Sequence, residues 1–271
     1  MSPPSDPRLN VTSDDGVVEI TMAYPPVNAF SGEFLQEILD AVRSVPADTR
    51  AVVVASSVDK IFAAGGDIQF MANGTLEEQL AYVALCQATY SSFEELECPA
   101  IAAIEGACLG GGVELSLGCD LRVVAESSKL GLPEVALGIL PGAGGTQRLG
   151  RAIGGSVARD LMLTGRRISG AEAAAIGLAN RLVPDGEALA TARDLARRFA
   201  DGATPAIAAI KRLTVAAPDH PLEEGLAQER AVWKSVRQSP HAQEGLEAFA
   251  QRRPADFRKA ARMTAQPPDA G

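Results

Sequence analysis

Four short segments rich in β-branched or small apolar residues alternate with stretches of helical periodicity in the first half of the chain. The predicted strands cover residues 17–22, 50–55, 100–105 and 121–125. Ser31 is a candidate N-cap for a helix between the first two, and residues 76–96 form a longer helical stretch that Pro99 ends. Runs of apolar residues are typical of strands buried on both faces, as in parallel sheets. The alternation therefore predicts an α/β fold.

The pattern changes after about residue 185, where only helical periodicity remains. Two apolar stripes follow, one of Leu189, Ala192, Leu195, Ala196 and Phe199, the other of Leu222, Leu226, Trp233 and Val236. Each stripe must pack against the core or against another subunit. We expect a flexible tail at 1–10, an α/β core at 11–200 and a helical region at 201–271.

Charge and residue content exclude several classes of protein. The net charge of −9 argues against a nucleic-acid partner. No segment resembles a signal peptide or reaches the ~20 apolar residues of a membrane span, so we predict a soluble, cytoplasmic protein without a membrane partner. The four cysteines lack metal-site spacing and are expected to be buried free thiols. His220 and His241, each beside a proline, are expected at the surface.

A glycine-rich stretch, Phe62–Asp67, follows the second predicted strand after a short loop. Small residues at such a place allow a ligand to approach the backbone closely. The alternative interpretation of the same residues is a plain glycine turn that ends at an N-cap aspartate.

A second stretch, Gly106–Asp120, places three glycines directly before Glu114 and an otherwise apolar helix. Glycines at a strand-to-helix junction leave backbone N–H groups free at the positive end of the helix dipole. The alternative is a close-packed turn in which Glu114 only caps its own helix.

Two further stretches contain Glu134 and a glycine cluster. Pro133 and Glu134 suit the first turn of a helix, which alone would explain them. The stretch 141–147 fails the dinucleotide-binding pattern, because Gln147 stands where its last glycine should be. The chain has no lipase-type serine motif and no P-loop. The remaining possibility is a site in which carboxylates act beside backbone N–H donors.

Together these stretches resemble the enoyl-CoA hydratase/isomerase (crotonase) family. The matching segments are IFAAGGDI, IEGACLGGGVELSLGCDLRVVAE and KLGLPEVALGILPGAGGTQRLGRAIG, with TPAIAAIKRL and SPHAQEGLEAFAQRR near the C-terminus. The resemblance covers about residues 17–257. It implies an α/β spiral of ββα units, a C-terminal trimerisation region, and a homotrimer or dimer of trimers.

The resemblance also implies the site. The N–H groups of Gly66 and Gly111 would stabilise the oxyanion of an acyl-CoA thioester, and Glu114 and Glu134 would act on a water between them. Neither a metal nor a cofactor is expected, since coenzyme A is part of the substrate. The implied substrate-binding positions are Ala64, Asp67, Ile68, Gln69, Gly110, Pro133 and Gly142. Phe70, Met71 and the 76–96 helix would line part of the acyl pocket.

Two departures from the family pattern accompany the match. Gly66 stands where alanine is common, which we expect to make the loop more mobile. Gln69 replaces a common lysine, so Lys211 or Arg212 becomes the candidate for a CoA phosphate contact. Both glutamates favour an enoyl-CoA hydratase; a Δ3,Δ2-enoyl-CoA isomerase or related lyase, or a non-catalytic acyl-CoA-binding protein, are the alternatives.

Overall fold

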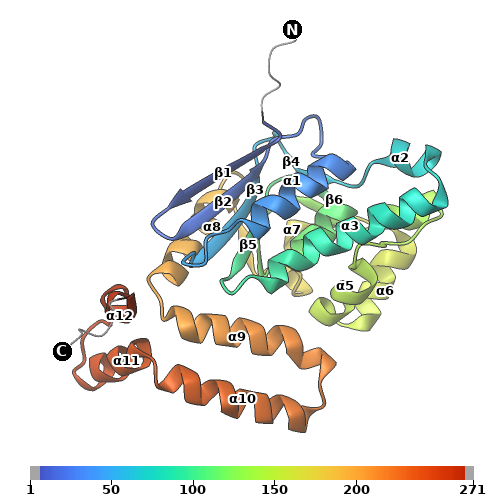
Figure 1. Cartoon of the computed structure of the whole chain (residues 1–271). Coiled ribbons are helices and arrows are strands. Elements are labelled where there is room, and N and C mark those ends of the chain that lie inside the picture. The colour runs from blue at the N-terminus through green and yellow to red at the C-terminus, as the bar shows by residue number, and fades with distance from the viewer. Residues whose placement is uncertain (1–6, 266–271) are drawn as a thin grey trace.

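The computed structural model describes residues 7–265, which form two β-sheets with helices around them (Figure 1). A six-stranded sheet has the order β1-β2-β3-β5-β7-β10, and a four-stranded sheet has the order β4-β6-β8-β9. The strands are β1 (Leu9–Asp14), β2 (Val17–Met22), β3 (Ala51–Ser56), β4 (Ile61–Ala64), β5 (Ala100–Ile104), β6 (Ala107–Leu109), β7 (Leu121–Ala125), β8 (Lys129–Gly131), β9 (Ile168–Ser169) and β10 (Arg181–Val183).

Consecutive strands enter different sheets, which builds the spiral. In the pairs β3/β4, β5/β6 and β7/β8, the first strand joins the large sheet and the second joins the small one, and both sets run parallel. Helices follow each pair: α2 (Ile68–Asn73) and α3 (Leu76–Glu95), then α4 (Gly111–Gly118), then the 3₁₀ turn η1 (Pro133–Leu137) with α5 (Gly145–Ile153) and α6 (Gly155–Thr164). The predicted α/β spiral of ββα units is confirmed.

Alternate residues of β3 show how the sheet separates two cores. Val52 and Val54 belong to a cluster between the sheets, whereas Ala51, Val53 and Ala55 belong to a second cluster on the other face. On the first side, α1 (Gly32–Arg43) packs against α3 and buries five apolar residues of one face: Phe34, Leu35, Ile38, Leu39 and Val42. Ser31 Oγ accepts a hydrogen bond from Phe34 N at 3.2 Å, so the predicted N-cap is confirmed.

Helix α8 (Ala188–Ala200) covers the second face of the large sheet. Its residues at four-residue spacing, Ala188, Ala192, Ala196 and Ala200, are completely buried. Small side chains at this spacing let the helix lie close to the strands. The helix α7 (Gly170–Ala175) precedes β10 in the chain.

The helical C-terminal region begins with α9 (Thr204–Ala216), the short turn η2 (Ala217–Asp219) and α10 (Leu222–Arg237), followed by α11 (Pro240–Ala250) and α12 (Phe257–Ala265). Helices α9 and α10 lie side by side and extend away from the sheets (Figure 1). Leu222, Leu226 and Trp233 are 79%, 42% and 65% exposed, so most of this predicted stripe is left uncovered by residues 7–265.

Several details differ from the sequence expectations. Leu9 and Asn10, predicted to lie in a loose tail, pair with Met22 and Thr21 in β1; residues 1–6 of that tail lie outside the described residues. His241 is buried and stacks on Phe257, so its predicted surface position is wrong. The four cysteines are buried and free, as predicted. Within residues 7–265, none of the helices combines the length and apolarity needed to cross a bilayer.

Candidate active site

Three neighbouring parallel strands of the small sheet end in register. Ala64 of β4 lies beside Leu109 of β6, and Leu109 lies beside Gly131 of β8. Directly beyond these strand ends lie the segments 65–66, 110–111 and 132–134. Ligands of open parallel sheets bind outside the carboxyl ends of the strands. This register brings three of the four stretches singled out in the sequence to one edge of the sheet.

Gly110 lies where these three segments meet. Its backbone adopts φ 54° and ψ −122°, a conformation that favours glycine. A Cβ at this position would stand 2.9 Å from Glu134 Oε1 and 3.4 Å from Gly65 Cα. The absence of a side chain therefore allows the glycine loop, the start of α4 and Glu134 to converge.

Two backbone N–H groups face this convergence without a partner. The first hydrogen bonds of α4 are donated by Val113 N and Glu114 N to Gly110 O, at 2.9 and 3.1 Å, so they leave the Gly111 N–H unused. Neither Gly66 N nor Gly111 N donates a hydrogen bond to another group in residues 7–265. Both glycines line the same cavity. A pair of such donors can bind an oxyanion.

The cavity has a volume of about 640 Å³ and is mostly apolar. Helix α3 forms one wall with Leu80, Val83 and Cys86, while the segment after Glu134 supplies Leu137 and Leu140. Its size and lining suit a largely apolar small molecule. Of the predicted site residues, the cavity brings together Ala64, Gly66, Ile68, Gly110, Gly111, Glu114, Pro133, Glu134 and Gly142.

Glu114 lies in the first turn of α4 and is only 4% exposed. Its Oε1 accepts hydrogen bonds from Ala143 N and Gly145 N, at 2.9 and 2.8 Å. Burial raises the pKa of Glu114 to about 7; these two N–H groups act in the opposite direction, and the negative charge of Glu134 adds to the rise. Glu114 therefore exchanges a proton near neutral pH.

Glu134 follows Pro133 at the start of η1. Burial raises the pKa of this carboxyl as well, and its Oε2 is buried without a hydrogen-bond partner among the described residues. Two carboxyls that disfavour ionisation at one site titrate as a pair and can hold a single proton between them. The pair can give and accept a proton within one cavity.

Two predicted substrate-binding residues do not line the cavity. Asp67 Oδ1 accepts a hydrogen bond from Phe70 N and thus caps α2, and the exposed Gln69 lies in the first turn of this helix. Met71 lines the predicted acyl wall, whereas Phe70 does not. Ile68 and Met71, three residues apart on one face of this short helix, line the cavity, and residue type alone does not reveal which face that is.

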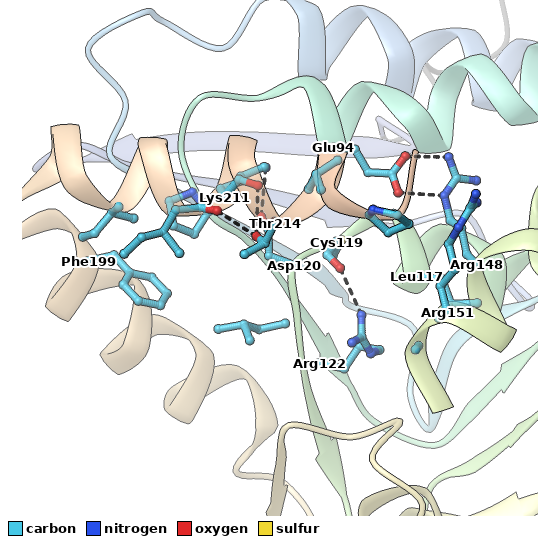
Figure 2. Close-up of a pocket in the computed structure, with 18 residues that line it drawn as sticks. Glu94, Leu117, Cys119, Asp120, Arg122, Arg148, Arg151, Phe199, Lys211 and Thr214 are labelled. Atoms are coloured by element: carbon cyan, nitrogen blue, oxygen red, sulfur yellow. Dashed lines mark hydrogen bonds and ion pairs between the residues drawn. The ribbon is translucent and has the colours of Figure 1, made fainter. Parts of the chain in front are cut away.

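A second cavity, of about 550 Å³, shares no lining residue with the first and contains Lys211 (Figure 2). The Lys211 ammonium donates to Phe93 O and Cys98 O and forms an ion pair with Asp120 at 2.9 Å. With a side chain only 5% exposed, Lys211 is committed to these internal partners. These internal contacts argue against Lys211 as the phosphate contact, and the exposed Arg212 stays the predicted candidate.

Three residues that hydrogen-bond to the site, Ala143, Gly145 and Tyr82, were not predicted from the sequence to do so. The glycine cluster 141–147 resembled a failed nucleotide motif, but its Ala143 and Gly145 N–H groups fix Glu114. Tyr82 of α3 hydrogen-bonds the backbone beside Gly66. For Ala143 and Gly145, the available signal was a row of small residues that matches no known motif. No local sequence feature indicated a role for Tyr82.

Comparison with known proteins agrees with this geometry. The sequence profile of the family described as Enoyl-CoA hydratase/isomerase matches residues 12–260. An Arabidopsis thaliana protein named Probable enoyl-CoA hydratase 2, mitochondrial, is 38% identical over 93% of this chain and 85% of its own length. The human Methylglutaconyl-CoA hydratase, mitochondrial, is 37% identical over 89% of this chain and 73% of its own length. A Geobacillus kaustophilus enoyl-CoA hydratase structure superposes with a TM-score of 0.89, at 36% identity over 92% of this chain and 96% of that one.

Proposed function

The chain belongs to the enoyl-CoA hydratase/isomerase family, and we propose that it is a hydratase, which adds water across the 2,3 double bond of a 2-trans-enoyl-CoA. The product is a 3-hydroxyacyl-CoA. The observation that carries this proposal is the pairing of the buried Glu114 and the half-buried Glu134 with two N–H groups that have no partner among residues 7–265, all in one apolar cavity.

Each group has a role in the proposed reaction. The thioester oxygen accepts hydrogen bonds from the N–H groups of Gly66 and Gly111. These two hydrogen bonds withdraw electron density from C3. A water gives a proton to one carboxylate of the pair as its oxygen bonds to C3, and the π electrons move to the thioester oxygen. The enolate then collapses as a proton from the other carboxyl reaches C2. Ala143 and Gly145 keep Oε1 of Glu114 in place during this transfer.

Hydration changes no overall oxidation state, so the proposed reaction needs no redox cofactor. We also propose that no metal takes part, because the N–H pair and the carboxyls supply both the electrophilic and the acid–base function. Full activity after treatment with a chelator would agree with this. The predicted cytoplasmic location stays a prediction.

The experiment that tests the proposal follows loss of the conjugated enoyl-thioester absorbance with crotonyl-CoA and longer 2-enoyl-CoAs. Glu114→Gln and Glu134→Gln should each lower kcat by about 100-fold or more, since each removes a proton-transfer group. Glu126→Gln, an exposed glutamate in the turn after β7, is the matched control and should leave kcat unchanged. Absence of turnover with every enoyl-CoA would refute the proposal.

An isomerase remains the second candidate because the family description names both activities. Moving a double bond needs a single group that shuttles a proton between two carbons, whereas hydration also needs a base for the water. The presence of both Glu114 and Glu134 in the cavity favours hydration. Conversion of a 3-enoyl-CoA without formation of a hydroxyl product would support the isomerase instead.

The cavity lining favours an apolar acyl chain. Its ionisable side chains are Glu114, Glu134, Tyr82, Cys86 and Tyr90, and the described lining contains no lysine, arginine or histidine. A methylglutaconyl group ends in a free carboxylate, which would lie near two glutamates with no cation of the described lining to balance it. We therefore propose linear or branched hydrocarbon enoyl groups as substrates, with kcat/KM at least about 100-fold higher than for an acyl group ending in a carboxylate.

We further propose that the chain assembles as a homotrimer or a dimer of trimers through its helical C-terminal region. The exposed apolar side chains of α9 and α10 support this: Ile210 (63%), Val215 (42%), Leu222 (79%), Leu226 (42%) and Trp233 (65%). Sedimentation analysis gives the mass of the assembly. Trp233 is the sole tryptophan, so its emission should shift to longer wavelength when dilution separates the subunits.

A further inference from the structure

The hydroxyl of Tyr82 joins two backbone segments at the glycine loop. Tyr82 lies in α3, and its Oη donates a hydrogen bond to Phe30 O at 2.6 Å. The same oxygen accepts a hydrogen bond from Asp67 N at 3.3 Å. Asp67 directly follows Gly66, so one phenol fixes the main chain next to a proposed oxyanion donor.

Gly66 and the Tyr82 hydroxyl compete for the same space. A Cβ at position 66 would stand 2.6 Å from Tyr82 Oη, closer than real Cβ contacts, but 3.6 Å from the ring carbon Cζ. Of the nearest Tyr82 atoms, only the hydroxyl oxygen would clash with this Cβ. The loop that the sequence led us to expect to be more mobile is therefore held by a side chain that needs glycine at this position.

Phe30 connects this hydroxyl to the second donor. Phe30 N donates to Gly65 O at 3.1 Å, and its ring atom Cδ2 lies 3.1 Å from where a Cβ of Gly111 would stand. The Phe30 side chain is completely buried, so it has little room to move. One residue thus touches both glycine segments, and Tyr82 holds the carbonyl of that residue.

Tyr82 keeps its proton over the working pH range. Burial raises the pKa of the phenol far above its usual value, and the neighbouring Cys86 thiol adds to the rise. The hydrogen bond from Oη to Phe30 O is therefore present at any pH at which the enzyme would be assayed. No change of protonation at Tyr82 enters the argument.

We infer that Tyr82 is a positioning residue: its hydroxyl sets the place of the Gly66 N–H relative to the Gly111 N–H, and Gly66 is glycine because this hydroxyl fills the space of a side chain. The inference rests on the proposed function in that both N–H groups bind the thioester oxygen. It adds a residue that lines the cavity, takes no part in the proton transfers and determines the spacing of the donors.

The test is a double-mutant cycle with Tyr82→Phe, Gly66→Ala and the double variant. Tyr82→Phe should lower kcat about 10-fold with KM changed less than about 2-fold, since a misplaced donor affects the transition state more than binding. Gly66→Ala should lower kcat about 100-fold, because the new methyl group meets Oη and displaces the loop. In the double variant the oxygen is gone, so activity should return to within about 3-fold of Tyr82→Phe.

Tyr24→Phe is the control, because Tyr24 lies outside the cavity, and it should leave kcat unchanged. Additive losses in the double variant, or an unchanged kcat in Tyr82→Phe, would overturn the inference. Hydrogen exchange of peptides covering residues 65–71 gives a readout without turnover: Tyr82→Phe should speed exchange there, and Tyr24→Phe should not. If the wild-type chain hydrates no enoyl-CoA, the proposed function fails, while the exchange measurement still decides whether Tyr82 holds the loop.

Discussion

Replacing Glu114 by glutamine should make the protein more stable at alkaline pH. The carboxyl ionises at about 7 in the folded state against an ordinary value of 4.5, so the folded state binds this proton more tightly than the unfolded state does. Stability is then lost as pH rises from 4.5 to about 7 and stays low above it. At ~1.4 kcal/mol for each pH unit, the full loss is about 3 kcal/mol.

Glutamine is neutral at every pH, and its amide oxygen can accept the same two hydrogen bonds from Ala143 N and Gly145 N. Glu114→Gln should therefore exceed the wild type by about 3 kcal/mol at pH 8 but by less than ~1 kcal/mol at pH 5. For a domain of this size the gain at pH 8 corresponds to a melting temperature about 6 to 10 °C higher.

Thermal melts of both proteins at pH 5 and pH 8 measure the effect, with Glu126→Gln as the exposed control that should show no pH-dependent difference. A melting temperature of Glu114→Gln that is lower than the wild type at pH 8, or an offset equal at both pH values, would refute the reasoning. The first result would mean that the two N–H donors stabilise the Glu114 carboxylate by more than burial destabilises it.

Three further substitutions test other parts of the structure. Gly110→Ala should abolish activity, because its Cβ would stand 2.9 Å from Glu134 Oε1 at a backbone φ of 54°; retained turnover in the enoyl-CoA assay would contradict this. Ser31→Ala should cost about 1 kcal/mol in urea unfolding with unchanged kcat, since it removes the N-cap of α1. Asn28→Ala should cost about 3 kcal/mol, because this completely buried amide donates to Ser56 Oγ and Phe62 O; a stable variant would show that the two acceptors find other partners.

The long, strongly patterned elements could be predicted from the sequence. Residues 121–125 form β7 as expected, and α3 ends within one residue of the predicted position. Each carries its own signal, either a run of apolar residues or an apolar helix face. The short strands β4, β6 and β8 were not predicted, because three or four residues beside glycines are too few to show the periodicity of a strand.

The residues of the candidate site also divide into those that the sequence predicted and those that it did not. Gly66, Gly111, Glu114 and Glu134 were found through a resemblance that spans separate stretches, and the register of β4, β6 and β8 explains physically why they meet. Tyr82 could not be found, since its role depends on a hydrogen bond to Phe30, 52 residues earlier in the chain. Contacts at such separation exist only once the helices are packed.

The buried ammonium of Lys211 links α9, the first helix of the helical C-terminal region, to the core. It joins α9 to the last turn of α3 through Phe93 O, to the residue preceding Pro99 through Cys98 O, and to Asp120, which itself accepts a hydrogen bond from Ala100 N. Removal of α9 would leave the Asp120 carboxylate without its cation at the start of β7, immediately after the helix that carries Glu114. Although the sequence pattern changes after about residue 185, we therefore expect the core and the helical C-terminal region to unfold as one cooperative unit.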